Sequence, residues 1–264
     1  MESFVRLAGF LGVLLVMASW ELIAPRRTLT AGKGWRWSTN LVLTVINTVA
    51  ARLLIPLSAA GLAEQAAERG WGILNLIDLP FAIELMLSVV ALDLAIFGQH
   101  VLFHAAPWLW RVHRVHHADL DCDASTGLRF HTLEILLSSL FKLGLVLLIG
   151  PPVWGVIAFE VVLNATSIFS HSNVWLPAWC DRGLRWLIVT PDMHRVHHSE
   201  VPAETNSNFG FNLSCWDRLF RTYRDQPAAG HDAATIGLPW PRDEATCCRL
   251  PGILRLPFRD PPPS

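Results

Sequence analysis

The stretch "LPFAIELMLSVVALDLAIFGQHVLFH" at residues 79–104 combines two features that decide the fold: an apolar run and a pair of histidines. A helix needs about 20 mostly apolar residues to cross a bilayer, and residues 79–99 supply that length. His100 and His104 follow, and their i, i+4 spacing puts both imidazoles on one helical face. The stretch predicts a transmembrane helix with a chelating histidine pair at its end.

The composition agrees with a membrane protein. Of the 264 residues, 52% are hydrophobic and only 16% are charged, whereas soluble domains carry about a quarter charged residues. The net charge of −1 gives no indication of a nucleic-acid partner. The five cysteines form no CxxC pair and no disulfide framework, so we expect reduced thiols or small buried apolar residues.

Further apolar runs lie at about 4–24, 39–60 and 133–170. Pro151-Pro152 interrupts the last run, which predicts two spans joined by a tight turn. Lys142 stands in the first half of this pair, and a central lysine is costly in a bilayer. Two arrangements follow: five full spans, or three spans and a re-entrant hairpin. The first run could also be a signal peptide, but Arg26 and Arg27 follow it, where a signal peptide has its charges in front.

Basic residues predict the orientation of these spans. Arg26, Arg27, Lys33 and Arg36 crowd the loop after the first run, which places that loop in the cytoplasm. Counting spans onward puts residues 100–131 and everything after about 170 on the same side. The sequence therefore predicts an all-α integral membrane protein with four to five transmembrane helices and a cytosolic histidine-rich metal-binding cap. Residues 1–225 would form one membrane-embedded domain, and 226–264 a loosely ordered, Pro-rich cytoplasmic tail.

The cap is predicted to hold most of the histidines. "HRVHH" occurs at 113–117 and again at 194–198. In a helix, this spacing lets one segment offer imidazoles to two neighbouring metal ions. His131 in "RFHTLE" and His171 in "FSHSN" add single histidines, whereas His231 has no companion in the tail. Ten histidines on one face predict a metal site, and imidazole suits zinc, copper, iron and nickel alike.

Other metal-site classes fit less well. A zinc protease of the HExxH type needs a motif that this sequence lacks. The Glu-x-x-His pairs of soluble di-iron bundles are also missing, since Glu134 and Glu200 do not have that spacing. A metal transporter would need ligands inside its spans, whereas these histidines stand at span ends. The pattern therefore favours a site made almost entirely of imidazoles.

The motif order HVLFH, HRVHH, RFHTLE, FSHSN, TPDMHRVHHSE and ETNSNFGFNLSCWDRLFRTY resembles the fatty acid hydroxylase/sterol desaturase superfamily of membrane di-iron enzymes. The resemblance covers residues 93–224. It implies a helical membrane bundle under a cytosolic histidine domain. It also implies the metal ligands His100, His104, His113, His116, His117, His194, His197 and His198. His131 and His171 match the variant of alkylglycerol-monooxygenase-like members, and we include both as expected ligands.

The resemblance also implies the chemistry. The expected activity is O2-dependent hydroxylation of a C–H bond of a lipid by two iron ions, a monooxygenase reaction. The alternatives are a lipid desaturase of the same superfamily and a zinc-dependent membrane hydrolase or metal-binding protein, and zinc could also replace iron in a purified sample. Because no GxGxxG or HPGG stretch is present, we expect a separate electron donor: a ferredoxin, cytochrome b5 or a reductase.

Several polar residues near the motifs have two readings. Asp93 is a candidate to accept a hydrogen bond from a ligand imidazole or to be a polar group satisfied by a neighbouring helix. Asn208 in "NSNFG" is a candidate to approach a metal through water or to form a turn beside Gly210. The aspartates of the "DLDCD" stretch at 119–123 are expected in an exposed acidic loop, with the orientation of metal ligands as the alternative. Six arginines are candidates for a basic face that docks the electron donor, although the positive-inside rule also accounts for them: Arg111, Arg114, Arg195, Arg218, Arg221 and Arg224.

Overall fold

The computed structural model describes residues 2–260, and helices and loops make up this whole range. Only three isolated β-bridges occur within it. Five helices in the described range are long and apolar enough to cross a membrane. The predicted all-α membrane fold is therefore confirmed. The five helices are α1 (Glu2–Ile23), α2 (Lys33–Leu54), α4 (Phe81–Ala105), α6 (Thr132–Ile149) and α7 (Val153–His171).

The predicted break at Pro151-Pro152 separates α6 from α7. Gly150 ends α6 with a φ of 67°, a left-handed conformation that favours glycine. Pro152 then precedes the first residue of α7. Both helices satisfy the length and composition expected of a membrane span. Lys142 of α6 pairs with Glu160 of α7 at 2.5 Å, which lowers the cost of each charge inside a membrane.

Large apolar side chains point outward from these helices. Leu15 of α1 is 70% exposed, Leu53 of α2 77% and Leu140 of α6 57%. Exposed apolar surface of this extent is costly in water but favourable in lipid. The outward faces of these helices are therefore suited to contact hydrocarbon.

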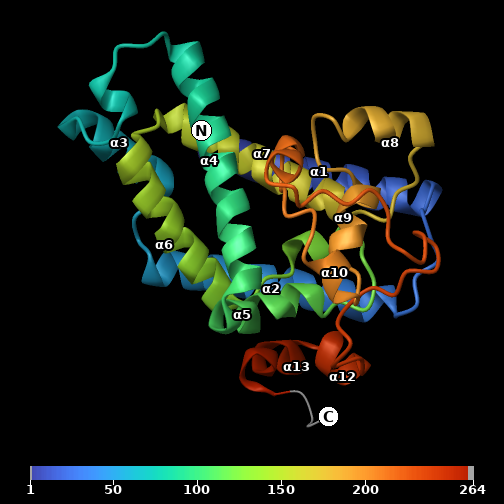
Figure 1. Ribbon diagram of the computed structural model, residues 1–264. Helices are drawn as coiled ribbons and strands as arrows, with labels where there is room; N and C mark the ends of the chain where they lie inside the picture. The colour runs from blue at the N-terminus through green and yellow to red at the C-terminus, as the bar shows by residue number, and fades with distance from the viewer. Residues whose placement is uncertain (1, 261–264) are drawn as a thin grey trace.

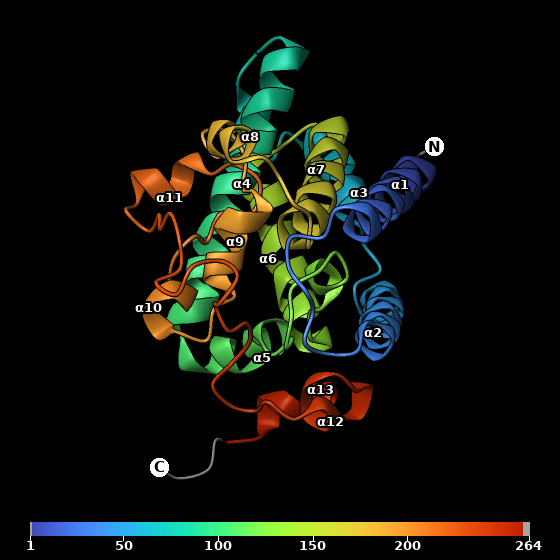
Figure 2. The same cartoon turned by 90° about the vertical axis from the view of Figure 1, so that its right-hand side faces the viewer.

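A proline-marked corner joins the membrane helices to the histidine region. α4 ends at Ala105, and Pro107 begins α5 (Pro107–His117). Proline suits the first turn of a helix, where its missing N–H costs nothing. Figure 2 shows α5 below α6 and α9. The remaining short helices are α3 (Ala59–Arg69), η1 (Leu74–Leu76), η2 (Thr126–Leu128), α8 (Ala178–Leu184), α9 (Pro191–His197), α10 (Pro202–Thr205) and α11 (Cys215–Leu219).

The segment after residue 225 is ordered as far as residue 260. It forms α12 (Glu244–Cys247), α13 (Leu250–Arg255) and η3 (Leu256–Phe258), which lie below α2 and α5 in Figure 1. Ile253 and Leu256 are fully buried in a cluster with Leu43 and Val115. The expectation of a loosely ordered tail is wrong for this part, because apolar side chains anchor it. The prolines at 261–263 lie outside the described residues.

The expected exposed acidic loop is also a wrong prediction. Asp119, Asp121 and Asp123 are all buried. The guanidinium of Arg36, itself fully buried in α2, donates to Asp119 at 2.5 Å and 3.0 Å and to Asp123 at 2.6 Å. Asp121 accepts hydrogen bonds from the backbone N–H groups just before α2. These ion pairs tie the loop after the first HRVHH copy to the start of α2.

Candidate metal centre

Nine of the ten histidines expected as ligands gather into two groups. Within each group, one potential ligand atom per residue lies within 4.8 Å of all the others. All nine are buried except His104, which is half-buried. The first group contains five histidines and the second four: His100, His104, His113, His117 and His197, and His116, His171, His194 and His198.

Each HRVHH copy is divided between the two groups. Its i, i+4 pair enters one group and its middle histidine enters the other. In α5 the pair is His113 and His117, which belong to the first group. In α9 and the residue that follows it, the pair is His194 and His198, which belong to the second. The two copies therefore exchange roles, and each helix borders both groups.

In the first group, three imidazoles converge through their Nε2 atoms. His100 Nε2 lies 3.1 Å from His113 Nε2 and 3.1 Å from His197 Nε2. The Nδ1 atom of each ring lies 2.7 Å from a hydrogen-bond acceptor, and these acceptors are Phe209 O, Glu134 Oε1 and Ser207 O, respectively. An Nδ1 that bonds an oxygen acceptor carries the proton, so each Nε2 presents a lone pair.

In the second group, the Nε2 atom of His171 lies close to the Nε2 atoms of all three other histidines. It lies 3.0 Å from those of His116 and His194, and 3.1 Å from that of His198. His171 Nδ1 donates to the carbonyl of Ser167 at 2.6 Å. His116 Nδ1 donates to the carbonyl of Arg129 at 3.1 Å. The Nε2 atoms of His116 and His171 therefore also meet as two lone pairs.

This arrangement fits a metal ion at each group. Facing lone pairs repel unless a cation lies between them. Metal–imidazole bonds of about 2.1 Å, as for zinc, would hold two nitrogens at right angles about 3 Å apart, which is the separation found here. Both ring nitrogens of His117 also lack a hydrogen-bond partner within residues 2–260. The oxygen acceptors on Nδ1 fix the ring orientations, as is usual for ligating histidines.

The imidazoles outside the membrane helices are kept neutral. Burial lowers the pKa of His116, His117 and His197 well below the ordinary value, and the neighbouring histidines lower it further. Neutral imidazole is the metal-binding form. These neutral imidazoles therefore have lone pairs available to bind metal ions.

His131, the tenth expected ligand, lies outside both groups. Its Nδ1 accepts a hydrogen bond from the backbone N–H of Leu133 at 3.2 Å and so caps the start of α6. Its Nε2 lies 3.3 Å from the carbonyl of Leu254. Of the two isolated histidines, His131 therefore caps a helix, and only His171 belongs to one of the two histidine groups.

Glu134 lies against the histidine groups and was not among the residues that the sequence singled out for the site. Its Oε1 accepts from His113 Nδ1 at 2.7 Å, whereas its Oε2 has no partner among the described residues. Glu134 lies near the start of α6, which carries it against α5. The signal in the sequence is the motif "RFHTLE", in which Glu134 follows His131 by three residues.

Asp93 and Asn208 have structural partners instead of imidazoles. Asp93 Oδ2 accepts from Trp216 Nε1 at 2.8 Å and from the backbone N–H of Leu213 at 3.1 Å. Asn208 adopts a φ of 53°, and its amide donates to the carbonyls of Met193 and Arg224. Asp93 is therefore the polar group satisfied by a neighbouring helix, through Trp216 of α11, and does not contact an imidazole. Asn208 is the turn residue of its second interpretation.

The expected basic face is incomplete. Arg114 is 8% exposed and donates to the carbonyl of Leu256, and Arg195 is 1% exposed and pairs with Asp192. These two arginines hold the protein together rather than face a partner. The other four remain candidates from their positions in the sequence.

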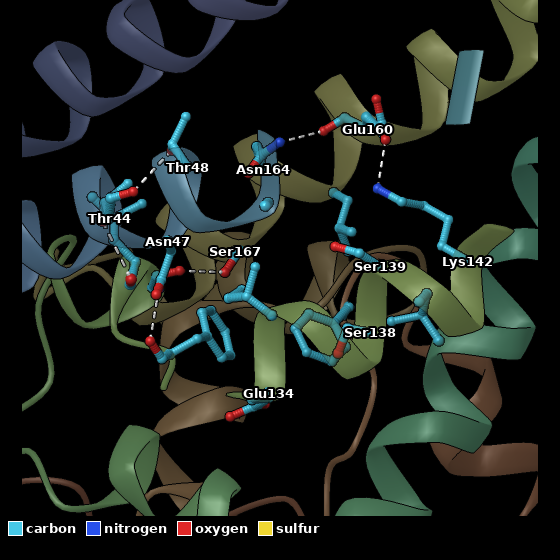
Figure 3. Close-up of a pocket in the computed structure, with 18 of the residues that line it drawn as sticks. Thr44, Asn47, Thr48, Glu134, Ser138, Ser139, Lys142, Glu160, Asn164 and Ser167 are labelled. Carbon is cyan, nitrogen blue, oxygen red and sulfur yellow. Dashed lines mark hydrogen bonds and ion pairs between the residues drawn. The ribbon is translucent and has the colours of Figure 1, made fainter. Parts of the chain in front are cut away.

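A cavity of about 480 Å³ borders the first histidine group. His100 and His113 lie at its wall, and Figure 3 shows Glu134 at one end with Lys142 and Glu160 toward the other. The five membrane helices α1, α2, α4, α6 and α7 line it, together with His113 of α5 and part of η2. Its volume is large enough to admit part of a lipid, since ligand pockets usually enclose about 300–1,000 Å³.

Comparisons with known proteins point to one family. The sequence model of the family described as "Fatty acid hydroxylase" matches residues 85–222, which include all nine clustered histidines. Ornithine lipid hydroxylase of Rhizobium tropici is 32% identical over 152 residues, 56% of this chain and 44% of that protein. Alkylglycerol monooxygenase of Danio rerio is 30% identical over 175 residues, 65% of this chain and 37% of that protein.

A third relative is named after a sterol. Cholesterol 25-hydroxylase of Homo sapiens is 27% identical over 146 residues, 53% of this chain and 51% of that protein. The chain thus spans between about a third and about a half of the length of the curated relatives it matches. No solved structure matches it.

Proposed function

Because the chain belongs to the fatty acid hydroxylase family, we propose that it is an O2-dependent membrane monooxygenase that hydroxylates a C–H bond of a lipid. The observation that carries this proposal is the pair of histidine groups beside a cavity among apolar helices. The names of the relatives support it, since hydroxylases and a monooxygenase of three lipid classes share the matched region.

The nine clustered histidines would hold two iron ions, five ligands at the first and four at the second. Bound iron supplies the redox chemistry that O2 activation and cleavage of an unactivated C–H bond require, whereas zinc has no redox chemistry. His131 is left out of this ligand set because it caps α6.

The remaining parts of the site orient ligands and substrate. Glu134 and the backbone carbonyls hold the imidazoles by their Nδ1 atoms. The cavity receives an apolar chain from the membrane and brings one of its carbon atoms to His100 and His113. The apolar part of the cavity wall also excludes water from the reaction. Positive-inside placement puts the centre on the cytoplasmic face, where a separate ferredoxin, cytochrome b5 or reductase supplies electrons.

The first experiment measures metal content and O2 consumption. Protein is purified from iron-supplemented cells together with the His116→Ala, His197→Ala and His231→Ala variants. We expect iron in the wild type and in His231→Ala, and a loss of iron and of O2 consumption in the other two. Lipids from the same cells should include one that gains an oxygen atom only with the active protein.

Other outcomes identify the alternatives. A lipid that loses two hydrogens without gaining oxygen would identify a desaturase. Zinc that stays bound under excess iron, with no O2 consumption, would support a zinc-dependent hydrolase or metal-binding protein and would contradict the monooxygenase.

A further inference from the structure

The cavity carries an unusual set of charges away from the histidines. Arg6 of α1, Arg52 of α2 and Lys142 of α6 line it together with Glu160 of α7. Along α6, Lys142 lies roughly 12 Å beyond Glu134, at about 1.5 Å of rise per residue. Figure 3 shows the side chains of Lys142 and Glu160 pointing toward each other, well apart from Glu134. The cavity therefore has two chemically different ends.

Positive charge exceeds negative charge at the end away from Glu134. Lys142 Nζ lies 2.5 Å from one carboxylate oxygen of Glu160, and an Arg6 guanidinium nitrogen lies 2.9 Å from the other. One carboxylate thus opposes two directly paired cations, and Arg52, an exposed residue of α2, also lines the cavity. No acidic partner of Arg52 occurs within the described residues. A bound anion would balance this excess.

The hydrogen-bond donors at this end are also in excess. An ammonium group has three N–H donors and a guanidinium has five. Glu160 occupies one direction of Lys142, and the Nε atom of Arg6 is buried without a partner in the part of the chain that the structure describes. Both oxygens of Glu160 are already engaged. A ligand that accepts hydrogen bonds fits this site, whereas a ligand that only donates them does not.

These charges also lie within membrane-spanning helices. Lys142 stands in the middle of α6 and Glu160 in the first half of α7. Ionisable residues at such depth are rare and usually mark a functional site. A structural ion pair needs one cation for one carboxylate, so it does not account for the additional arginines.

The geometry points to a binding subsite for the anionic headgroup of a membrane lipid at Lys142, Arg6 and Arg52. This inference rests on the proposed function, since it names the class of lipid that the monooxygenase takes. The carboxylate or phosphate of the lipid binds the surplus donors, and its apolar chain continues toward His100 and His113. The distance between the two ends then selects which carbon, counted from the headgroup, is oxidised.

The test measures binding, which is independent of turnover. Full-length metal-loaded protein in neutral phosphatidylcholine nanodiscs is titrated with pyrene-labelled hexadecanoic acid and with its methyl ester. We expect the acid to bind about tenfold more tightly, the effect of one charged hydrogen bond. Lys142→Gln should remove this preference, Lys142→Arg should retain it and Glu160→Gln should increase it. Arg182→Gln, which removes an exposed arginine outside the cavity, should leave it unchanged.

Equal binding of acid and ester by the wild-type protein, or an unchanged preference in Lys142→Gln, would overturn the subsite. Displacement of the acid by inorganic phosphate at the same concentration would show a free-anion site and overturn the assignment to a lipid. The proposed function is judged separately. If the protein prefers the acid but no oxygenated lipid is found, the headgroup subsite is supported and the proposed monooxygenase function is contradicted. If oxygenated lipid is found without a preference for the acid, the function is supported and the subsite is contradicted.

Discussion

The Nε2 atoms of His116 and His171 lie 3.0 Å apart, although 55 residues separate the two histidines in the sequence. His116 comes from the first HRVHH copy and His171 from the last position of α7. The Nε2 atom of His171 also lies 3.0 Å from that of His194 and 3.1 Å from that of His198, both in the second group. His171, from the short motif "FSHSN", therefore lies close to every other histidine of the second group.

We predict that His171→Ala loses the metal ion of the second group and keeps that of the first under excess iron. The Nε2 atom of His171 lies within 3.1 Å of the Nε2 atoms of the other three histidines of its group, and His171 is not a member of the first group. Metal analysis of purified protein should show about half of the wild-type iron. His131→Ala is the matched control, since His131 belongs to neither group. Full metal retention in His171→Ala would contradict the assignment.

Glu134→Gln should weaken metal binding without unfolding the protein. The carboxylate accepts the Nδ1 proton of His113 and so fixes which nitrogen faces the centre. Loss of such a partner typically costs about 10–100-fold in metal affinity. Competition with a chelator measures the affinity, and Glu68→Gln, an exposed position on α3, is the control. Equal chelator resistance in both variants would argue against an orienting role.

Asp119→Asn should destabilise the protein by about 1–3 kcal/mol, because the buried guanidinium of Arg36 loses one of its two carboxylate partners and keeps only Asp123. Asp119 and Arg36 are both fully buried and paired at 2.5 Å. Thermal unfolding in detergent measures the change. Asp260→Asn provides the contrast, since the Asp260 side chain is 74% exposed in its pair with Arg111 and surface pairs contribute about 0–1 kcal/mol.

Acid should destabilise the metal-free protein. Burial, and after it the neighbouring imidazoles, lower the pKa of His116, His117 and His197 in the folded state. The unfolded chain therefore binds more protons just below the ordinary histidine pKa of about 6.5, and the free energy of unfolding falls as pH falls through that value. Thermal melts of chelator-treated protein at neutral and mildly acidic pH measure this. A melting temperature that rises on acidification would contradict it.

Much of the fold and most of the centre could be predicted from local patterns. The apolar runs and Pro151-Pro152 correctly predicted the membrane helices, because span length and proline are local properties. The HxxHH spacing also predicted that one helix borders two metal positions, and the two groups divide each copy in that way. Periodicity within one helix is sufficient for both conclusions.

Contacts between distant segments account for the errors. His131 and His171 looked equivalent in the sequence, yet one begins a helix and caps it, whereas the other ends a helix that points into the centre. Asp119 looked exposed because its partner, Arg36, is 83 residues away. Local polarity cannot show whether a charge has a buried counterpart elsewhere in the chain.

The exchange of histidines between the two HRVHH copies has a consequence for how metal is loaded. α5 and the segment around α9 each contribute histidines to both groups. The first ion to bind would therefore draw the two segments together and order imidazoles that the second ion needs. The second ion then meets a smaller entropic cost than the first. We therefore expect positive cooperativity between the two binding events, with a half-loaded protein scarcely populated during titration at limiting iron.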